Sequence, residues 1–212
     1  MQKIYFISTV HKDIGKCNGY ELHKILSNLS PEVVFLEALE STYSEYDRMK
    51  FLSFGIFHKK LEIMSIQKYF LESTFKYIPV LDIGHSEEFE KKYDFVCQNF
   101  EHQRLLNKLN SLASDLGFSF LNSPQAMELE DELRKLEEQI FNNPEEQKKV
   151  EDHIDDYENN MIKNIYSYCR ENHFNKAVFM CGVAHRKSML QKIAEYEEAT
   201  DLKLDWKFPT EF

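Results

Sequence analysis

The sequence lacks any apolar run that approaches the roughly 18 residues needed to cross a bilayer. Its first residues, MQKIYFISTV, also lack the order of charged, apolar and small residues that marks a signal peptide. Internal repeats and low-complexity linkers are absent as well. We therefore expect a protein without a membrane span that stays in the cytoplasm.

Cysteine is scarce, and no two cysteines form a CxxC pair. Thiols in a reducing compartment rarely form bridges, so we expect four free thiols. We assign no catalytic role to these four residues: Cys17, Cys97, Cys169 and Cys181.

Positive charge is in short supply, because the formal net charge is −10 at pH 7. Residues 123–160 alone hold thirteen carboxylates against four basic side chains and contribute −9 of this charge. A negative surface repels phosphate backbones and anionic lipids. The charge therefore argues against nucleic acid or a membrane as the main partner.

The chain does contain enough apolar material for a core, since 42% of its residues are hydrophobic and 14% are aromatic. Four short apolar runs, at residues 4–7, 33–36, 78–83 and 177–181, predict strands that are buried on both faces. A helical leucine pattern that ends at Ser30 joins the first two runs. This βαβ pattern predicts that these two strands are parallel neighbours. The alternating run at 202–206 is interpreted as an edge strand.

The middle of the chain predicts helices: residues 40–77 are mostly helical with a break at 53–55, and a helical insertion spans about 98–172. Two stretches with apolar stripes meet at Asn142-Asn143-Pro144 and predict a long acidic helical hairpin before the last parallel strand. The stripes are interpreted as core, or alternatively as a surface for a partner or a second copy of the chain. We expect a single α/β domain over residues 1–212, with a mostly parallel central sheet flanked by helices.

A titratable side chain follows each of the four predicted strands: His11, Glu37, His85 and His185. Ligands of open parallel sheets bind outside the carboxyl ends of the strands. We therefore expect these side chains to meet in one pocket, with Asp82 and His85 binding substrate. For Asp82 and His85 the alternative is a turn at Gly84 that exposes both.

The residue types suggest a chemistry for this pocket. An imidazole takes a proton from water or binds a divalent ion, and a carboxylate orients the imidazole or shares the metal. Two histidines and a carboxylate are also the minimum set for a metal-activated water. His11, Glu37 and His185 are therefore the candidate catalytic residues, and the candidate ligands of a divalent metal such as manganese, cobalt or zinc. No local signature such as HExxH accompanies them.

Four segments, IYFISTVH, VVFLEAL, YENNMIKNI and AVFMCGVAHR, follow one another along the chain. Their order resembles the superfamily that joins TraB/PrgY proteins, Tiki proteases and erythromycin esterases. The family pattern is a Gly-Thr-x-His-like turn, a strand that ends in glutamate, a helix with Arg-Asp-x-x-Met-x-x-Asn, and a strand that closes on Gly-x-x-His. The matching residues here are Thr9, His11, Glu37, Glu158 in place of aspartate, Met161, Asn164, Gly182 and His185. Tyr157 departs from the family arginine, and Ser8 departs from the glycine.

The resemblance covers the two ends of the chain, residues 4–39 and 157–190. It implies an α/β fold with one pocket, in members that hydrolyse peptide or ester bonds with or without a divalent metal. It also implies a catalytic role for Glu158 and substrate contacts for Tyr157 and Asn164. The alternative for Glu158 is a place on a solvated acidic helix face.

Two functions stay open at this stage. The first is a hydrolase in which His11, His185 and Glu37 activate water, directly or through a metal, to attack an ester or amide of a small molecule or peptide, while Arg186 steadies the oxyanion. The second is a non-catalytic ligand-binding or signalling module that uses the acidic hairpin for a partner. Tyr157 favours the second, whereas the retained histidines and glutamate favour the first. The remaining histidines, His58, His102, His153 and His173, are interpreted as surface residues.

Overall fold

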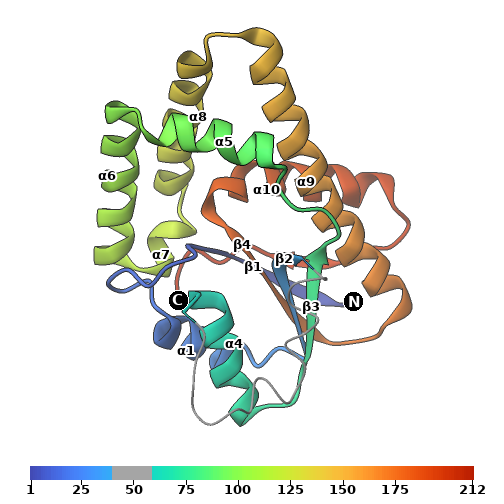
Figure 1. The fold of residues 1–212 in the computed structure, drawn as a ribbon. Coiled ribbons are helices and arrows are strands. Elements are labelled where there is room, and N and C mark those ends of the chain that lie inside the picture. The colour runs from blue at the N-terminus through green and yellow to red at the C-terminus, as the bar shows by residue number, and fades with distance from the viewer. Residues whose placement is uncertain (40–58) are drawn as a thin grey trace.

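The computed structural model describes residues 1–39 and 59–212, and it contains a five-stranded sheet in which every strand runs parallel to its neighbours (Figure 1). The order across the sheet is β3-β2-β4-β1-β5. Helices cover both faces, so the predicted α/β class is confirmed. The strands are β1 (Lys3–Thr9), β2 (Val33–Leu39), β3 (Lys76–Leu81), β4 (Lys176–Gly182) and β5 (Asp205–Lys207).

The last long strand, β4, lies at the centre of the sheet, between β1 and β2. Phe179 of β4 pairs with Phe6 on one side and with Phe35 on the other. The prediction that the first two strands are direct neighbours was therefore wrong, although they are parallel. The physical reason is burial, because β4 is apolar on both faces and an edge position would leave one of its sides unpaired.

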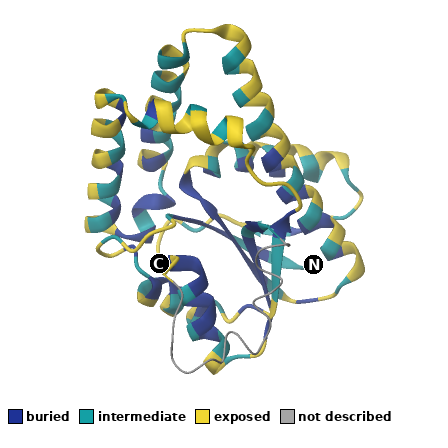
Figure 2. Cartoon of the chain, viewed as in Figure 1, coloured by how far each residue is buried: buried dark blue, intermediate teal, exposed yellow. Residues whose placement is uncertain are grey.

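Side chains of the strands alternate between two hydrophobic clusters on opposite faces of the sheet. In β4, Val178 and Met180 belong to one cluster, and Ala177 and Phe179 belong to the other. Helices α1 (Gly19–Leu29) and α4 (Leu61–Glu72) cover the first face, and α9 (Pro144–Glu171) and α10 (Arg186–Ala199) cover the second (Figure 1). Strands β1, β2 and β4 are accordingly deeply buried, whereas the edge strands β3 and β5 are less so (Figure 2).

The helices between β3 and α9, called the helical insertion from here on, stand over the carboxyl edge of the sheet (Figure 1). Ser123 and Asn143 cap the two helices of the predicted hairpin, α8 and α9, by accepting backbone N–H bonds. Apolar residues of α6, α7 and α8 join the cluster of α1 and α4, whereas the tip of the hairpin is exposed (Figure 2). The helices of the insertion are α5 (Glu87–Cys97), α6 (Phe100–Leu116), α7 (Phe118–Leu121) and α8 (Pro124–Phe141).

Two predicted strands differ slightly in extent. The third was expected at 78–83, but β3 ends at Leu81 because the Asp82 N–H donates to the side chain of Asn160 on α9 at 2.8 Å. The expected edge strand at 202–206 is the shorter β5, which pairs with β1. The helical pattern at 40–77 lies partly outside the described residues, and its break at 53–55 and His58 lie wholly outside them.

In the described ranges, none of the helices is both long and apolar enough to cross a bilayer. All four cysteines are free thiols, as predicted, and three of them are buried. Burial raises the pKa of Cys17 and of Cys169 to about 12, so both stay protonated at neutral pH.

Candidate functional site

A cavity of about 500 Å³ lies at the carboxyl edge of the sheet, beneath the helical insertion. Its floor comes from the ends of β1, β2 and β4, at Thr9, Glu37 and Gly182. The pairing of β2 with β4 ends at Leu36, so the two strands part at the next residue. This parting gives the Glu37 side chain a place between the strand ends.

Glu37 is held by hydrogen bonds on both of its carboxylate oxygens. Its Oε2 accepts from the backbone N–H of Gly182 at 2.6 Å, and its Oε1 accepts from the Tyr157 hydroxyl at 3.0 Å. Burial alone would raise the pKa of Glu37, but the charges of His185 and His11 outweigh it and lower that pKa. Glu37 is therefore a buried carboxylate that stays ionised.

His185 follows β4 in a short 3-10 turn, Val183–His185, and its side chain is largely buried. Its Nδ1 lies 2.8 Å from Oε1 of Glu158, and its Nε2 lies 3.5 Å from Oε1 of Glu37. Burial would lower the pKa of His185, yet the charges of Glu37 and Glu158 together raise it. The predicted Glu158 thus lies at the site, where it orients the imidazole of His185.

His11 follows β1, and its side chain is half exposed. Its Nδ1 lies 3.1 Å from Oε1 of Glu62, a buried carboxylate near the start of α4 that also accepts from the Thr9 hydroxyl at 2.6 Å. The hydrogen bond with Glu62 raises the pKa of His11 to about 9. Sequence analysis missed Glu62, although its place between Leu61 and Ile63 repeats the signal that singled out Glu37, a carboxylate among apolar residues.

Both histidines have their Nε2 atoms near the Glu37 carboxylate. A methyl group placed on Gly182 would lie 3.3 Å from Oε2 of Glu37 and 3.5 Å from Nε2 of His11. A carboxylate on Nδ1 sets the tautomer and the orientation of an imidazole, which leaves Nε2 for chemistry. His11, Glu37 and His185 therefore meet in one cavity, as the strand ends predicted.

The expected metal site is less well supported by this arrangement. Within residues 1–39 and 59–212, no three His, Cys, Asp or Glu side chains converge as ligands of one ion. Both Glu37 oxygens already accept hydrogen bonds from Gly182 and Tyr157. The donors as placed do not form a ligand set, so the binding of manganese, cobalt or zinc stays a prediction.

The predicted substrate-binding residues divide into two groups. His85 lines the cavity, and the ring of Tyr157, which is not itself in the lining, stacks against His85 at 4.5 Å and against His185 at 5.5 Å. Asp82 and Asn164 instead bond to each other at 2.8 Å and tie the end of β3 to α9. The Asn164 bond also lowers the pKa of Asp82. These two residues are not part of the cavity lining, so a substrate role for them is not supported.

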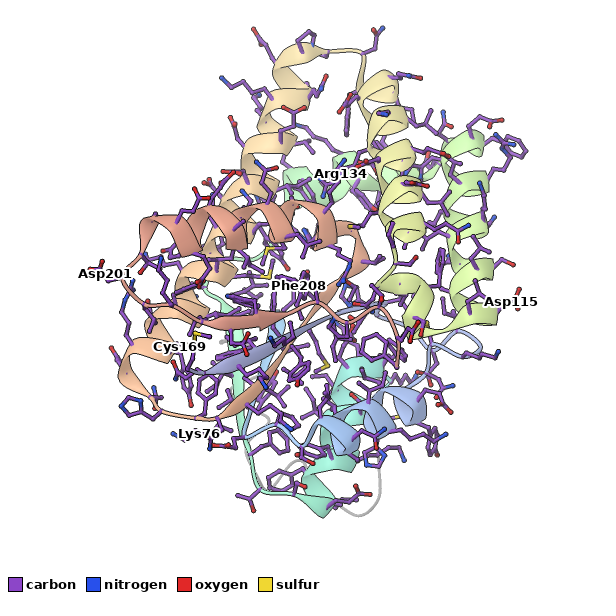
Figure 3. All side chains as sticks on the ribbon, turned by 180° about the vertical axis from the view of Figure 1, so that it is seen from behind. Lys76, Asp115, Arg134, Cys169, Asp201 and Phe208 are labelled. Atoms are coloured by element: carbon purple, nitrogen blue, oxygen red, sulfur yellow. The ribbon has the colours of Figure 1, made fainter. Side chains whose placement is uncertain are left out.

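Arg186, expected to steady an oxyanion, lies elsewhere, which corrects the prediction. It is fully buried and donates from Nη1 to Asn122 at 2.7 Å and to Ser8 at 3.1 Å, and burial lowers its pKa to about 10. The guanidinium at the cavity belongs to Arg134 of α8, labelled in Figure 3. It donates to the backbone carbonyl of Ala184 at 2.6 Å. In the sequence, nothing distinguishes Arg134 from the other charged residues that are expected on an exposed helix face.

The helical insertion forms the opposite wall of the cavity. His102 of α6 lies there with 1% of its surface exposed, so the expectation of a surface residue was wrong. Its Nε2 lies 3.0 Å from Oε1 of Glu137 on α8. Burial raises the pKa of Glu130, on the same wall, to about 7, and it outweighs the attraction of Arg134, which is only partly offset by repulsion from Glu137.

Aromatic rings lie between the strand ends at the cavity floor and helix α5. The His85 ring stacks between Tyr157 and Phe89 of α5, at 4.5 Å from each, and its Nδ1 lies 3.0 Å from Nε2 of His153. Burial and the neighbouring His153 lower the pKa of His85, so it stays neutral at pH 7. The cavity thus has an ionic floor, an aromatic side and an acidic far wall.

No protein-family model, curated protein or solved structure matches the chain in comparisons with known proteins.

Proposed function

We propose that the chain is a hydrolase that attacks an ester or amide carbonyl with water activated at the cavity floor. The observation that carries the proposal is a pair of histidines, His11 and His185, that flank one carboxylate and are each anchored at Nδ1 by another. A nitrogen base oriented by a carboxylate is the usual device for moving a proton in acyl transfer. The resemblance of the strand-end motifs to Tiki, TraB and erythromycin-esterase proteins supports the same reaction class.

The two imidazoles suit different steps. His11 is the more exposed, and its deprotonated form takes a proton from water through Nε2 while Glu62 stabilises the imidazolium that forms. The water oxygen then bonds to the carbonyl carbon. His185, whose pKa is raised by Glu37 and Glu158, gives a proton in its protonated form to the leaving oxygen or nitrogen. The proton that His11 gained returns to His185, so the site ends the cycle as it began.

A metal-assisted route and a non-catalytic role are the rival proposals. In the first, His11, His185 and Glu37 would bind a divalent ion that lowers the pKa of the attacking water. The second rests on Tyr157, which bonds to Glu37 where the related families carry arginine. In that role the pocket would bind a small ligand in the cytoplasm, and the acidic hairpin would contact a partner or a second copy.

Turnover and binding measured on matched variants separate these proposals. We expect the wild type to hydrolyse members of a panel of aryl esters and peptides, and His11→Ala or His185→Ala to lower kcat by about 10² to 10⁴. His173→Ala, at an exposed residue on another part of the surface, should leave kcat unchanged. Metal analysis of the same proteins tests the metal route, which predicts that ion content falls with turnover.

The opposite outcomes are equally clear. If no substrate turns over but a ligand stabilises the wild type and not the two variants, the binding module replaces the hydrolase. If His11→Ala and His185→Ala match the wild type in turnover, metal content and thermal shift, as the control His173→Ala should, the cavity floor is neither a catalytic site nor a ligand-binding site.

A further inference from the structure

The far wall of the cavity carries a histidine that the proposed chemistry does not use. His102 is almost completely buried and lines the cavity. Its Nε2 lies 3.0 Å from Oε1 of Glu137, so in the neutral ring Nε2 carries the proton that the carboxylate accepts, and Nδ1 is an acceptor. No hydrogen-bond partner for this Nδ1 exists among the residues that the structure describes. Buried polar atoms are nearly always paired in folded proteins, so an unpaired acceptor in a residue that lines a cavity is a candidate contact for a donor group of a ligand.

Carboxyl groups around His102 add negative charge when they are ionised, and Glu130, with its pKa of about 7, is about half ionised at neutral pH. Glu130 and Glu137 of α8 face the cavity beside it, and Glu90 and Asp94 of α5 line the same side. The nearby guanidinium of Arg134 is turned towards the carbonyl of Ala184 and towards Glu158, 3.8 Å away. The wall therefore offers mainly hydrogen-bond acceptors to a ligand.

An acceptor-rich, negatively charged wall selects a group that carries donors and positive charge. A protonated amine has both, whereas a carboxylate or phosphate would be repelled. The rings of Phe89 and Tyr93 line the cavity between this wall and the catalytic edge, and aromatic faces also attract ammonium groups. Charge, acceptor geometry and aromatic surface thus favour the same kind of ligand.

We propose that His102, Glu130 and Glu137 form a subsite for the ammonium group of an amine-bearing substrate. The inference rests on the proposed function, since the subsite would hold one end of a molecule whose ester or amide bond lies at Glu37 and the two histidines. It names a substrate class that the catalytic residues alone do not select. His102 and the two glutamates then act as specificity residues that position the substrate.

A binding experiment without turnover tests the subsite. The full-length protein is titrated with n-butylammonium chloride and, in parallel, with n-butanol plus equal sodium chloride, and binding is followed by thermal shift and by NMR. We expect the ammonium to bind at least tenfold more tightly than the alcohol. In the double variant Glu130→Gln/Glu137→Gln this preference should disappear, because the charge is removed at nearly constant shape.

Matched variants make the result decisive. Glu132→Gln, an exposed acid on the same helix, should keep the preference, and so should His11→Ala at the catalytic edge. If the double variant fails to fold, Glu130→Gln alone is measured, and it should weaken ammonium binding at least threefold. The inference is overturned if alcohol and ammonium bind alike, or if the glutamine variants bind ammonium as the wild type does.

The two proposals fail in different ways. Ammonium binding with no turnover on any ester or amide would overturn the hydrolase while leaving the subsite. Turnover that depends on His11 and His185, but shows no preference for amine-bearing substrates and no ammonium binding, would overturn the subsite alone.

Discussion

Gly182 shows at the residue scale how little space the candidate site allows. Its backbone N–H holds Glu37, and the place of its missing side chain lies between Glu37 and His11. Its φ of −56° is open to any residue, so the requirement for glycine here is one of space. Even a methyl group at residue 182 would therefore push the Glu37 carboxylate and the His11 imidazole apart.

We expect Gly182→Ala to lower kcat/KM by about 10- to 100-fold, because the new methyl separates Glu37 from His11, and misplacements of this order cost that much. Its free energy of unfolding should fall by less than about 2 kcal/mol. Steady-state kinetics and urea unfolding measure both effects. Gly84→Ala is the matched control, since a methyl there meets the side chain of Leu39 at 3.1 Å instead of the site. Equal losses in both variants would contradict this account of Gly182.

Glu130 predicts a pH-dependent cost in stability. Its pKa is about 7 in the folded chain and 4.5 in its ordinary state, so folding favours the protonated form. The stability that it contributes is complete below pH 4.5 and is lost as the pH rises through 7. At pH 8 we expect Glu130→Gln to be more stable than the wild type by about 1 to 3 kcal/mol. Urea unfolding at several pH values should show this difference vanish near pH 4, and a constant difference would argue against the buried ionised carboxylate.

Short helix α7 illustrates the element scale, because one buried side chain fastens it to the sheet. Asn122 accepts from the Ser8 N–H at 2.8 Å and from Arg186 at 2.7 Å, and its Nδ2 donates back to the Ser8 carbonyl at 3.2 Å. The same residue therefore joins the helical insertion to β1 and supplies a partner for a buried guanidinium. This is the structural role of the arginine that sequence analysis had placed in catalysis.

Asn122→Ala should destabilise the fold by about 3 to 5 kcal/mol, because it leaves the Arg186 charge buried with fewer partners. Asn99→Ala, which removes only the capping bonds at the start of α6, should cost about 1 kcal/mol. Chemical denaturation of the two variants measures the contrast. Similar losses for both would show that the Asn122 network is not a structural tie.

The distribution of burial matters at the scale of the whole molecule. The strands lie between two layers of helices (Figure 1), whereas α5 has one fully buried residue, Val96, and is mostly exposed (Figure 2). Phe89 and Tyr93 of this helix line the cavity. The least buried helix of the insertion is therefore also part of the cavity wall.

Hydrogen exchange should follow this distribution, because local opening is easiest where few apolar contacts are lost. We expect amides of α5 to exchange at least 100-fold faster than those of β4, and to slow when n-butylammonium is bound. Mass spectrometry of peptides covering residues 87–97 and 176–182 measures both rates. Protection of α5 equal to that of β4 would mean that the helix is a rigid part of the core.

The sequence alone predicted the α/β class, the four long strands and the acidic hairpin. It also predicted that His11, Glu37 and His185 meet at one edge of the sheet. Each depends on local periodicity, or on the rule that parallel strands place their carboxyl ends at one edge. Glu158 was also predicted, because the segment YENNMIKNI on α9 resembles the family motif that has an aspartate at this position.

Only the tertiary structure placed β4 between β1 and β2, gave Glu62 to His11 and buried His102 against Glu137. It also placed Arg186 in the interior and Arg134, not predicted from the sequence, at the cavity. The physical reason is that these pairings join residues 35 or more positions apart along the chain, the shortest being the pairing of His102 with Glu137. Their geometry is decided by how helices pack on the sheet, which no nearby run of residues encodes.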